Sequence, residues 1–175
     1  CGTSYYAGLV GKFMLEEISR IPVEVDLGSE FRYRDPLVDE RSLIILISQS
    51  GETADTLAAM REGKGKGAKT LAICNAVESS LARDSDSVLY TQAGPEIGVA
   101  STKAFTSQVT ALFLVALFLG KMRGTLPDER ACQLIQDLVR LPRLMEKVLT
   151  LDSEIEKIAQ VYADAHNFLY LGRGI

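Results

Sequence analysis

A dense run of hydroxyl and amide side chains, Ser-Gln-Ser-Gly-Glu-Thr, occupies residues 48–53. It follows an uninterrupted aliphatic segment, residues 43–47, and precedes a segment with helical character that starts near Thr53. Hydroxyl groups, a glycine that lets the backbone turn closely around a ligand, and the free N–H groups of a helix N-terminus together suit an anion of phosphate size. The pattern therefore predicts a loop that holds a small phosphate ester.

The same residues also have a purely structural explanation, in which Ser50 or Thr53 caps the helix and Glu52 lies in its first turn. The residues alone leave both explanations open. The run is not a P-loop, because G-x-x-x-x-G-K-[ST] is absent, and no G-x-G-x-x-G follows a strand. A nucleotide is thus a poorer candidate than a simple phosphate ester.

Two other segments repeat the theme of a hydroxyl at a helix start. Thr3 and Ser4 lie near the start of the sequence, and Ser4 is expected to cap the first helix. Ser101 is expected to cap a long apolar helix, with Lys103 as a nearby cation. Each of these, taken alone, is more readily a capping hydroxyl or a solvated charge. The indication of function comes from three such helix starts converging on one site.

Aliphatic runs and amphipathic segments alternate along the chain, which predicts an α/β fold with a parallel sheet. The strand at residues 43–47 is expected to be central and buried on both faces, and the helix at residues 101–122 should lie deep in the core. Ligands of open parallel sheets bind outside the carboxyl ends of the strands, so the three loops should gather there. Strands are expected at residues 23–26, 43–47, 70–74, 87–90 and 168–171, helices at 4–20, 53–62, 101–122, 128–149 (with Pro142 as a candidate kink) and 152–165, and a short helix or irregular segment at 29–39.

The composition indicates a soluble globular protein and excludes several classes of function. The chain has 175 residues, 47% of them hydrophobic and 24% charged, with a formal net charge of −4. This acidic balance disfavours nucleic acid, whose phosphate backbone requires a basic surface. The most apolar stretch, residues 111–119, is about half the length of a membrane span, so we expect a buried helix and no membrane partner.

Cysteine and histidine are too sparse for a metal site or a disulfide framework. Cys1, Cys74 and Cys132 show no C-x-x-C spacing, and His166 is the only histidine. We therefore expect no metal, no cofactor and a reducing, cytoplasmic location. Cys1 is not expected to act as a nucleophile, and His166 is expected to have a structural or surface role and not a catalytic one. The chain starts without methionine and ends in an apolar run broken by glycines, which predicts a fragment cut at both ends.

Four segments together resemble one known family. They are C-G-T-S at residues 1–4, S-E-F-R-Y-R at 29–34, S-Q-S-G-E-T-A-D-T-L at 48–57 and P-E-I-G-V-A-S-T-K-A-F at 95–105. They closely resemble the sugar-isomerase (SIS) half of the glutamine–fructose-6-phosphate aminotransferases (isomerising), also called glucosamine-6-phosphate synthases. The S-Q-S-G-E-T run alone would indicate only an SIS domain, and the E-I-G-V-A-S-T-K run narrows the resemblance to this family. The similarity covers nearly the whole chain.

The resemblance implies a three-layer α/β/α fold with a five-stranded parallel sheet in the flavodoxin-like arrangement. It implies fructose 6-phosphate as substrate and glucosamine 6-phosphate as product, with ammonia delivered from glutamine by a separate glutaminase domain. It places Thr3 and Ser4 on the sugar or its phosphate, and Val99 and Ser101 near the reacting carbons. The residues that it implies for the phosphate are Ser48, Gln49, Ser50 and Thr53.

The family has two SIS subdomains, and this chain resembles the first. Residues 1–165 are expected to form that subdomain with its C-terminal helices, and residues 166–175 to start a truncated second one. The family's proton-transferring glutamate and lysine and its ring-opening histidine would lie beyond Ile175, and His166 does not match that histidine's motif. We therefore expect weak sugar-phosphate binding and no synthase activity from this chain alone.

Two other functions stay open. SIS domains also serve as regulatory binding modules in transcription factors, so a non-catalytic sugar-phosphate sensor is the main alternative. A basic DNA-binding module in the flanking sequence would favour this alternative, and none is visible in these 175 residues. A phosphosugar isomerase with a single SIS domain would need a complete active site in one chain or across a dimer, and the scarcity of histidine argues against it. The resemblance also implies a homodimer formed through the isomerase half.

Overall fold

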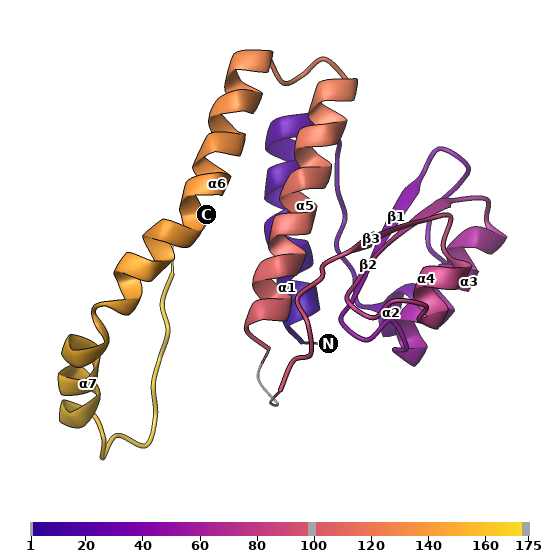
Figure 1. The fold of residues 1–175 in the computed structure, drawn as a ribbon. Coiled ribbons are helices and arrows are strands. Elements are labelled where there is room, and N and C mark those ends of the chain that lie inside the picture. Colours follow the sequence, from indigo (N-terminus) through magenta and orange to yellow (C-terminus); the bar gives the residue numbers. More distant parts are fainter. Residues whose placement is uncertain (1, 98–100, 173–175) are drawn as a thin grey trace. The chain divides into compact units, whose positions relative to one another are not determined.

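The aliphatic runs of the sequence form a parallel sheet whose strand ends are level with one another. The computed structural model describes residues 2–97 and 101–172. Its strands, in sheet order, are β1 (Leu43–Ser48), β2 (Lys69–Cys74) and β3 (Ser87–Tyr90) (Figure 1). The register pairs Ser48 with Cys74 and Cys74 with Tyr90, so the carboxyl ends of the three strands meet at one edge.

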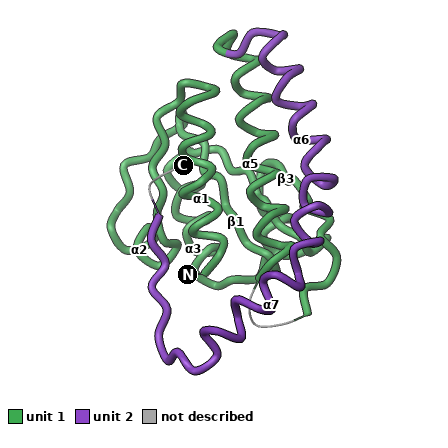
Figure 2. Tube along the Cα trace, turned by 90° about the vertical axis from the view of Figure 1, so that its left-hand side faces the viewer, with its two compact units in different colours: residues 1–125 green, residues 126–175 purple. Residues whose placement is uncertain are grey.

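The chain divides into two units, Cys1–Thr125 and Leu126–Ile175, which Figure 2 colours separately. The first unit holds the sheet and the helices α1 (Thr3–Met14), α2 (Gly28–Tyr33), α3 (Ala54–Gly65), α4 (Ser80–Asp84) and α5 (Lys103–Met122). A π-helical segment, Leu15–Ser19, continues α1. The second unit holds two amphipathic helices, α6 (Asp128–Leu149), with Pro142 inside it, and α7 (Asp152–Val161).

Each face of the sheet carries its own apolar cluster, because successive side chains of a strand point to opposite faces. The first cluster joins α1 and α5 to the sheet through Ala7, Ile73, Ala111 and Leu112. The second joins α3 and α4 to the sheet through Leu46, Met60, Ala72 and Leu81. The predicted α/β class with a parallel sheet is therefore confirmed, and helices pack on both faces of the sheet.

Helices α1 and α5 lie side by side on the first face (Figure 1). A Cβ atom on Gly11 would lie 2.8 Å from Leu112 Cδ1, so this close approach of the two helices requires glycine. By length and composition alone, α5 is apolar enough to cross a membrane. Its Ala111 and Leu112 are instead buried between α1 and the sheet, so we assign the helix to the core.

Two segments predicted as strands are not strands in the structure. Within residues 23–26, the N–H of Val23 donates to the carboxylate of Glu16 (3.1 Å) instead of to a neighbouring strand. Residues 168–171 have exposed side chains and no strand partner in the described part of the chain.

The expectation that β1 is central is also wrong for the described sheet. β1 lies at the edge, and β2, which pairs on both sides, is the more buried strand.

Some helix boundaries differ from the prediction. α1 starts at Thr3 with Gly2 at the N-cap, so Ser4 lies inside the first turn and is not the predicted cap. α5 starts at Lys103, and one side of it remains open, with Phe118 63% exposed, so the helix is only partly in the core. α6 covers the expected residues, and α7 ends four residues earlier than expected.

We expect the substitution Leu112→Ala to lower the free energy of unfolding by about 2–5 kcal/mol, because it leaves a cavity between α1 and α5. Leu114, on the same helix, is 44% exposed, compared with 2% for Leu112. The control Leu114→Ala should therefore cost much less. Urea denaturation of both variants measures the difference, and equal losses would contradict the assignment of α5 to the core.

Candidate functional site

The loop after β1 is held by its own hydroxyl groups. Ser48, the last residue of β1, is 4% exposed. Its Oγ accepts a hydrogen bond from the N–H of Gly51 (3.1 Å) and lies 3.0 Å from Thr53 Oγ1. Ser50 Oγ accepts from the N–H of Glu52 (3.2 Å). These bonds turn the backbone sharply at the carboxyl edge of the sheet.

Gly51 has a conformation and an environment that require glycine. Its φ is +66°, and a Cβ atom there would lie 2.1 Å from Ser79 Oγ. Its carbonyl oxygen accepts from the N–H of Leu81 (3.0 Å), which fastens the loop to α4. The loop thus approaches α4 so closely that no side chain fits between them.

Glu52 belongs to this attachment and does not serve as a free acid. Its Oε1 accepts from the N–H of Ser80 (2.7 Å) at the start of α4. This backbone hydrogen bond is the main reason that the pKa of Glu52 lies below its ordinary value. The side chain is therefore a carboxylate at neutral pH and is already engaged with α4.

The N-terminus of α3 keeps free donors at this edge. Thr53 occupies the N-cap, but its hydroxyl lies near Ser48 and does not cap the helix. In the described ranges, the N–H groups of residues 54–56 have no hydrogen-bond partner. The carboxylate of Asp55, which would repel an anion here, lies 3.3 Å from Arg32 Nη1. Unpaired N–H groups beside exposed hydroxyls form a site that can bind an anion.

Asn75 organises the same edge, and sequence reasoning missed it. Its backbone N–H donates to the carbonyl of Gln49 (3.1 Å), and its amide nitrogen donates to the carbonyl of Gly94 (2.8 Å). Its amide oxygen accepts hydrogen bonds from the N–H of Ala93 (2.7 Å) and from the hydroxyl of Thr91 (3.2 Å). Asn75 thereby connects the loop after β1 with the segment after β3. An amide residue directly after a buried strand was the available signal.

The start of α5 is capped by Glu96, not by Ser101 as predicted. Glu96 accepts from the N–H of Ala104 (2.8 Å) and from the N–H and hydroxyl of Thr102 (3.2 and 3.1 Å). The bond from Ala104 is the main reason that the pKa of Glu96 lies below its ordinary value. Ser101 is half-buried and takes no part in these capping hydrogen bonds. Val99, the other predicted sugar contact in this segment, lies outside the described residues.

The remaining predicted residues come from α1. Ser4 accepts a hydrogen bond from Gln108 on α5 (3.1 Å). Gly8, one turn further along α1, is near β1, because a Cβ atom there would lie 3.7 Å from Ile47 Cδ1. The start of α1 is therefore close to the carboxyl end of β1, although no hydrogen bond between described residues joins Thr3 or Ser4 to the loop (Figure 1).

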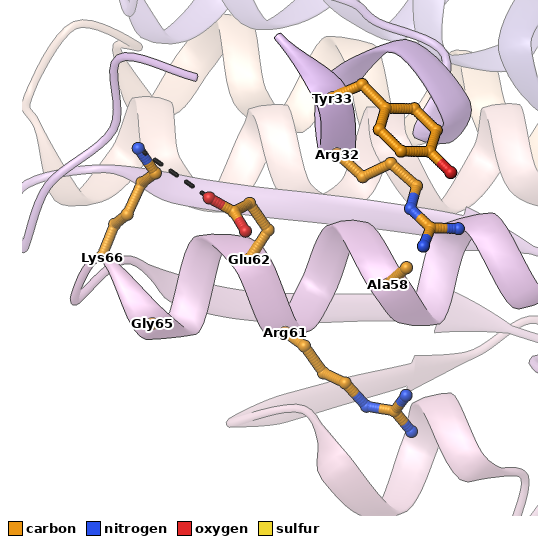
Figure 3. A pocket seen from close by; sticks show the side chains of 7 residues that line it. All are labelled: Arg32, Tyr33, Ala58, Arg61, Glu62, Gly65 and Lys66. Carbon is orange, nitrogen blue, oxygen red and sulfur yellow. Dashed lines mark ion pairs between the residues drawn. The ribbon is translucent and has the colours of Figure 1, made fainter. Parts of the chain in front are cut away.

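A separate pocket of about 620 Å³ lies between α2 and α3 (Figure 3). Its lining includes three cations, but Arg32 is near Asp55 and Lys66 lies 3.9 Å from Glu62. The nearby carboxylates compensate much of the positive charge, so we do not assign this pocket to a phosphate. Within residues 2–97 and 101–172, no cluster of side chains is suited to a metal ion.

Comparisons with known proteins agree with this geometry. A family model described as SIS domain matches residues 1–118. The chain is 51% identical, over its full length, to a glutamine–fructose-6-phosphate aminotransferase [isomerizing] of Caldanaerobacter subterraneus, and 53% identical to that of Pseudomonas putida. It spans only 29% of the length of each. The solved C-terminal domain of glucosamine-fructose-6-phosphate aminotransferase from Francisella tularensis superimposes with a TM-score of 0.95 at 43% identity, covering 99% of this chain and 49% of that one. These similarities confirm the resemblance inferred from the motifs.

We expect Gly51→Ala to destabilise the protein by about 1–3 kcal/mol, since it combines a strained backbone with an overlap at Ser79. Gly65→Ala, at the end of α3, is the matched control, because a Cβ atom there has no neighbour within 4 Å. Thermal denaturation compares the two. A Gly51→Ala variant as stable as the control would show that the loop does not need its contact with α4.

We expect Glu96→Gln to weaken the cap of α5 at neutral pH. The folded-state pKa of Glu96 lies below the ordinary value of 4.5. Its stabilisation is thus present above that value and is lost as the pH falls through the lowered pKa. Hydrogen exchange of the Ala104 amide should be faster in the variant at neutral pH, and the difference should vanish in acid. Glu40→Gln, at an exposed position, is the control. A difference that persists in acid would contradict the role of the Glu96 charge.

Proposed function

This chain belongs to the SIS domain family, and from this membership we propose that it binds fructose 6-phosphate. In the parent enzyme it would be part of the aminotransferase that makes glucosamine 6-phosphate and glutamate from fructose 6-phosphate and glutamine. The observation that carries the proposal is the loop of residues 48–53, where exposed hydroxyls lie beside the unpaired N–H groups that begin α3.

The phosphate is assigned to this loop. Ser50 and Thr53 are exposed at the helix N-terminus and can donate hydrogen bonds to phosphate oxygens. Buried Ser48 shapes the loop through its contact with Thr53, and half-buried Gln49 is the next residue of the same turn. Binding through backbone and hydroxyl donors needs no cluster of cations, which fits a chain with a net charge of −4.

The sugar is assigned to the starts of α1 and α5. Thr3 and Ser4 would contact the sugar or its phosphate, and Val99 and Ser101 would line the reacting carbons. The placement of α1 beside β1, through Gly8, supports the first pair. The capped start of α5 supports Ser101, which precedes the helix.

The chemical steps are assigned to the part of the relatives that this chain does not span. Aldose–ketose isomerisation needs groups that move protons. Two carboxylates at this edge of the sheet, those of Glu52 and Glu96, already accept backbone N–H groups and have lowered pKa values, and the carboxylate of Asp55 is paired with Arg32. This chain would therefore hold the substrate, and other residues of the whole enzyme would transform it. The alternative is a non-catalytic sensor that uses the same site.

The finer architecture is also a proposal. Residues 1–165 would form the first SIS subdomain and residues 166–175 the start of a second, within a three-layer, five-stranded, flavodoxin-like sheet. We further propose a homodimer and a cytoplasmic location, the latter supported by the free thiols of Cys74 and Cys132.

We expect the chain to bind fructose 6-phosphate and Ser50→Ala to weaken that binding by about ten- to a hundredfold, the effect of losing one hydrogen bond to a charged group. Ser87→Ala, at the exposed amino end of β3, should leave the affinity unchanged. An NMR titration measures both, with fructose as the ligand that lacks phosphate.

Two outcomes would contradict the proposal. Equal affinity for fructose and fructose 6-phosphate would show that the loop does not hold a phosphate. Formation of glucosamine 6-phosphate by this chain from fructose 6-phosphate and ammonia would show that it already contains the proton-transferring groups.

A further inference from the structure

We infer that Gln108 is a positioning residue, which holds the hydroxyl of Ser4 so that its proton points to the bound sugar phosphate. The inference rests on the proposed function and deepens it, because it gives a role to a residue of α5 that lies behind the site. Gln108 is far from Ser4 in the sequence and lies in none of the motifs described above. Only the packing of α1 against α5 brings the two residues together.

Gln108 is a polar side chain in an apolar place. It is 2% exposed and lies on the buried side of α5, one turn from Ala111 and Leu112. Burying an amide is unfavourable unless both of its ends find hydrogen-bond partners. An apolar side chain of similar length would fill the same volume without this cost. The amide therefore calls for an explanation beyond packing.

The hydrogen bond made by the amide nitrogen offers that explanation. Gln108 Nε2 donates to Ser4 Oγ over 3.1 Å, so an acceptor position of the hydroxyl is occupied. A hydroxyl that accepts in this way still has its own proton to donate. Ser4 is the second residue of α1, so no helical carbonyl four residues earlier can take that proton. Among residues 2–97 and 101–172 no group accepts that proton, which leaves it for a ligand at the start of α1.

The other end of the amide shows that its orientation matters. Gln108 Oε1 is the only buried side-chain nitrogen or oxygen atom of the described ranges without a hydrogen-bond partner. If the amide were rotated by 180°, the Ser4 hydroxyl would donate to Oε1, and its proton would be engaged in a hydrogen bond inside the protein. The orientation with Nε2 on Ser4 keeps an unpaired oxygen in the core but leaves the hydroxyl ready to donate outwards.

The test compares four forms of the chain: wild type, Gln108→Met, Ser4→Ala and the double variant. Fructose 6-phosphate affinity is measured by NMR titration. We expect Gln108→Met to weaken binding by roughly two- to tenfold. The double variant should bind no more weakly than Ser4→Ala alone, because Gln108 acts only through Ser4. Gln133→Met is the control, since Gln133 is exposed on α6 and its amide contacts Asp137.

A second readout needs no ligand. Scalar couplings of the Ser4 side chain should show one rotamer in wild type and an average of rotamers in Gln108→Met. Gln108→Leu repeats both measurements if the methionine variant does not fold.

Three results would overturn the inference: unchanged affinity in Gln108→Met together with a loss in Ser4→Ala, losses that add in the double variant, or an unchanged Ser4 rotamer. If wild type does not bind fructose 6-phosphate, the proposed function fails. The rotamer measurement then decides the positioning role by itself, and averaging in the variant supports it.

Discussion

The parallel register of the sheet is the constraint on which the rest of the structure depends. It aligns Ser48, Cys74 and Tyr90, so the segments that follow β1, β2 and β3 leave the sheet at one edge. Asn75 then connects the first and third of these segments, the first through its backbone N–H and the third through its side-chain amide. Without this alignment, the hydroxyl loop and the start of α5 would have no reason to be near each other.

At this edge, charged side chains organise the backbone, and neutral groups are left for the ligand. Glu52 holds the start of α4, and Glu96 holds the start of α5. Arg32 is paired with Asp55. The groups that remain exposed at this edge are the hydroxyls of Ser50 and Thr53 and the N–H groups that begin α3. Neutral donors of this kind suit the proposed binding of a phosphate ester better than the transfer of protons.

Much of the local structure could be predicted from the sequence, because its signals are local. The aliphatic runs predicted β1, β2 and β3, the hydroxyl run predicted a turn before α3, and the long motifs indicated the SIS family. Predictions based on the positional preference of a single residue type were less reliable. Serine is a common N-cap residue, which is why Ser4 and Ser101 were predicted as caps. In the structure Gly2 is the N-cap of α1, and the side chain of Glu96 caps α5.

What the sequence by itself determined is therefore the fold class, the family and the loop of residues 48–53, since each is encoded in contiguous residues. The tertiary structure alone decided which polar groups remain available to a ligand. The Thr53 hydroxyl lies beside Ser48 instead of capping α3, and Gln108 holds Ser4 across two helices. The physical reason is that a hydrogen-bonding group is free or engaged according to its neighbours in space, and those neighbours are set by the packing of distant segments.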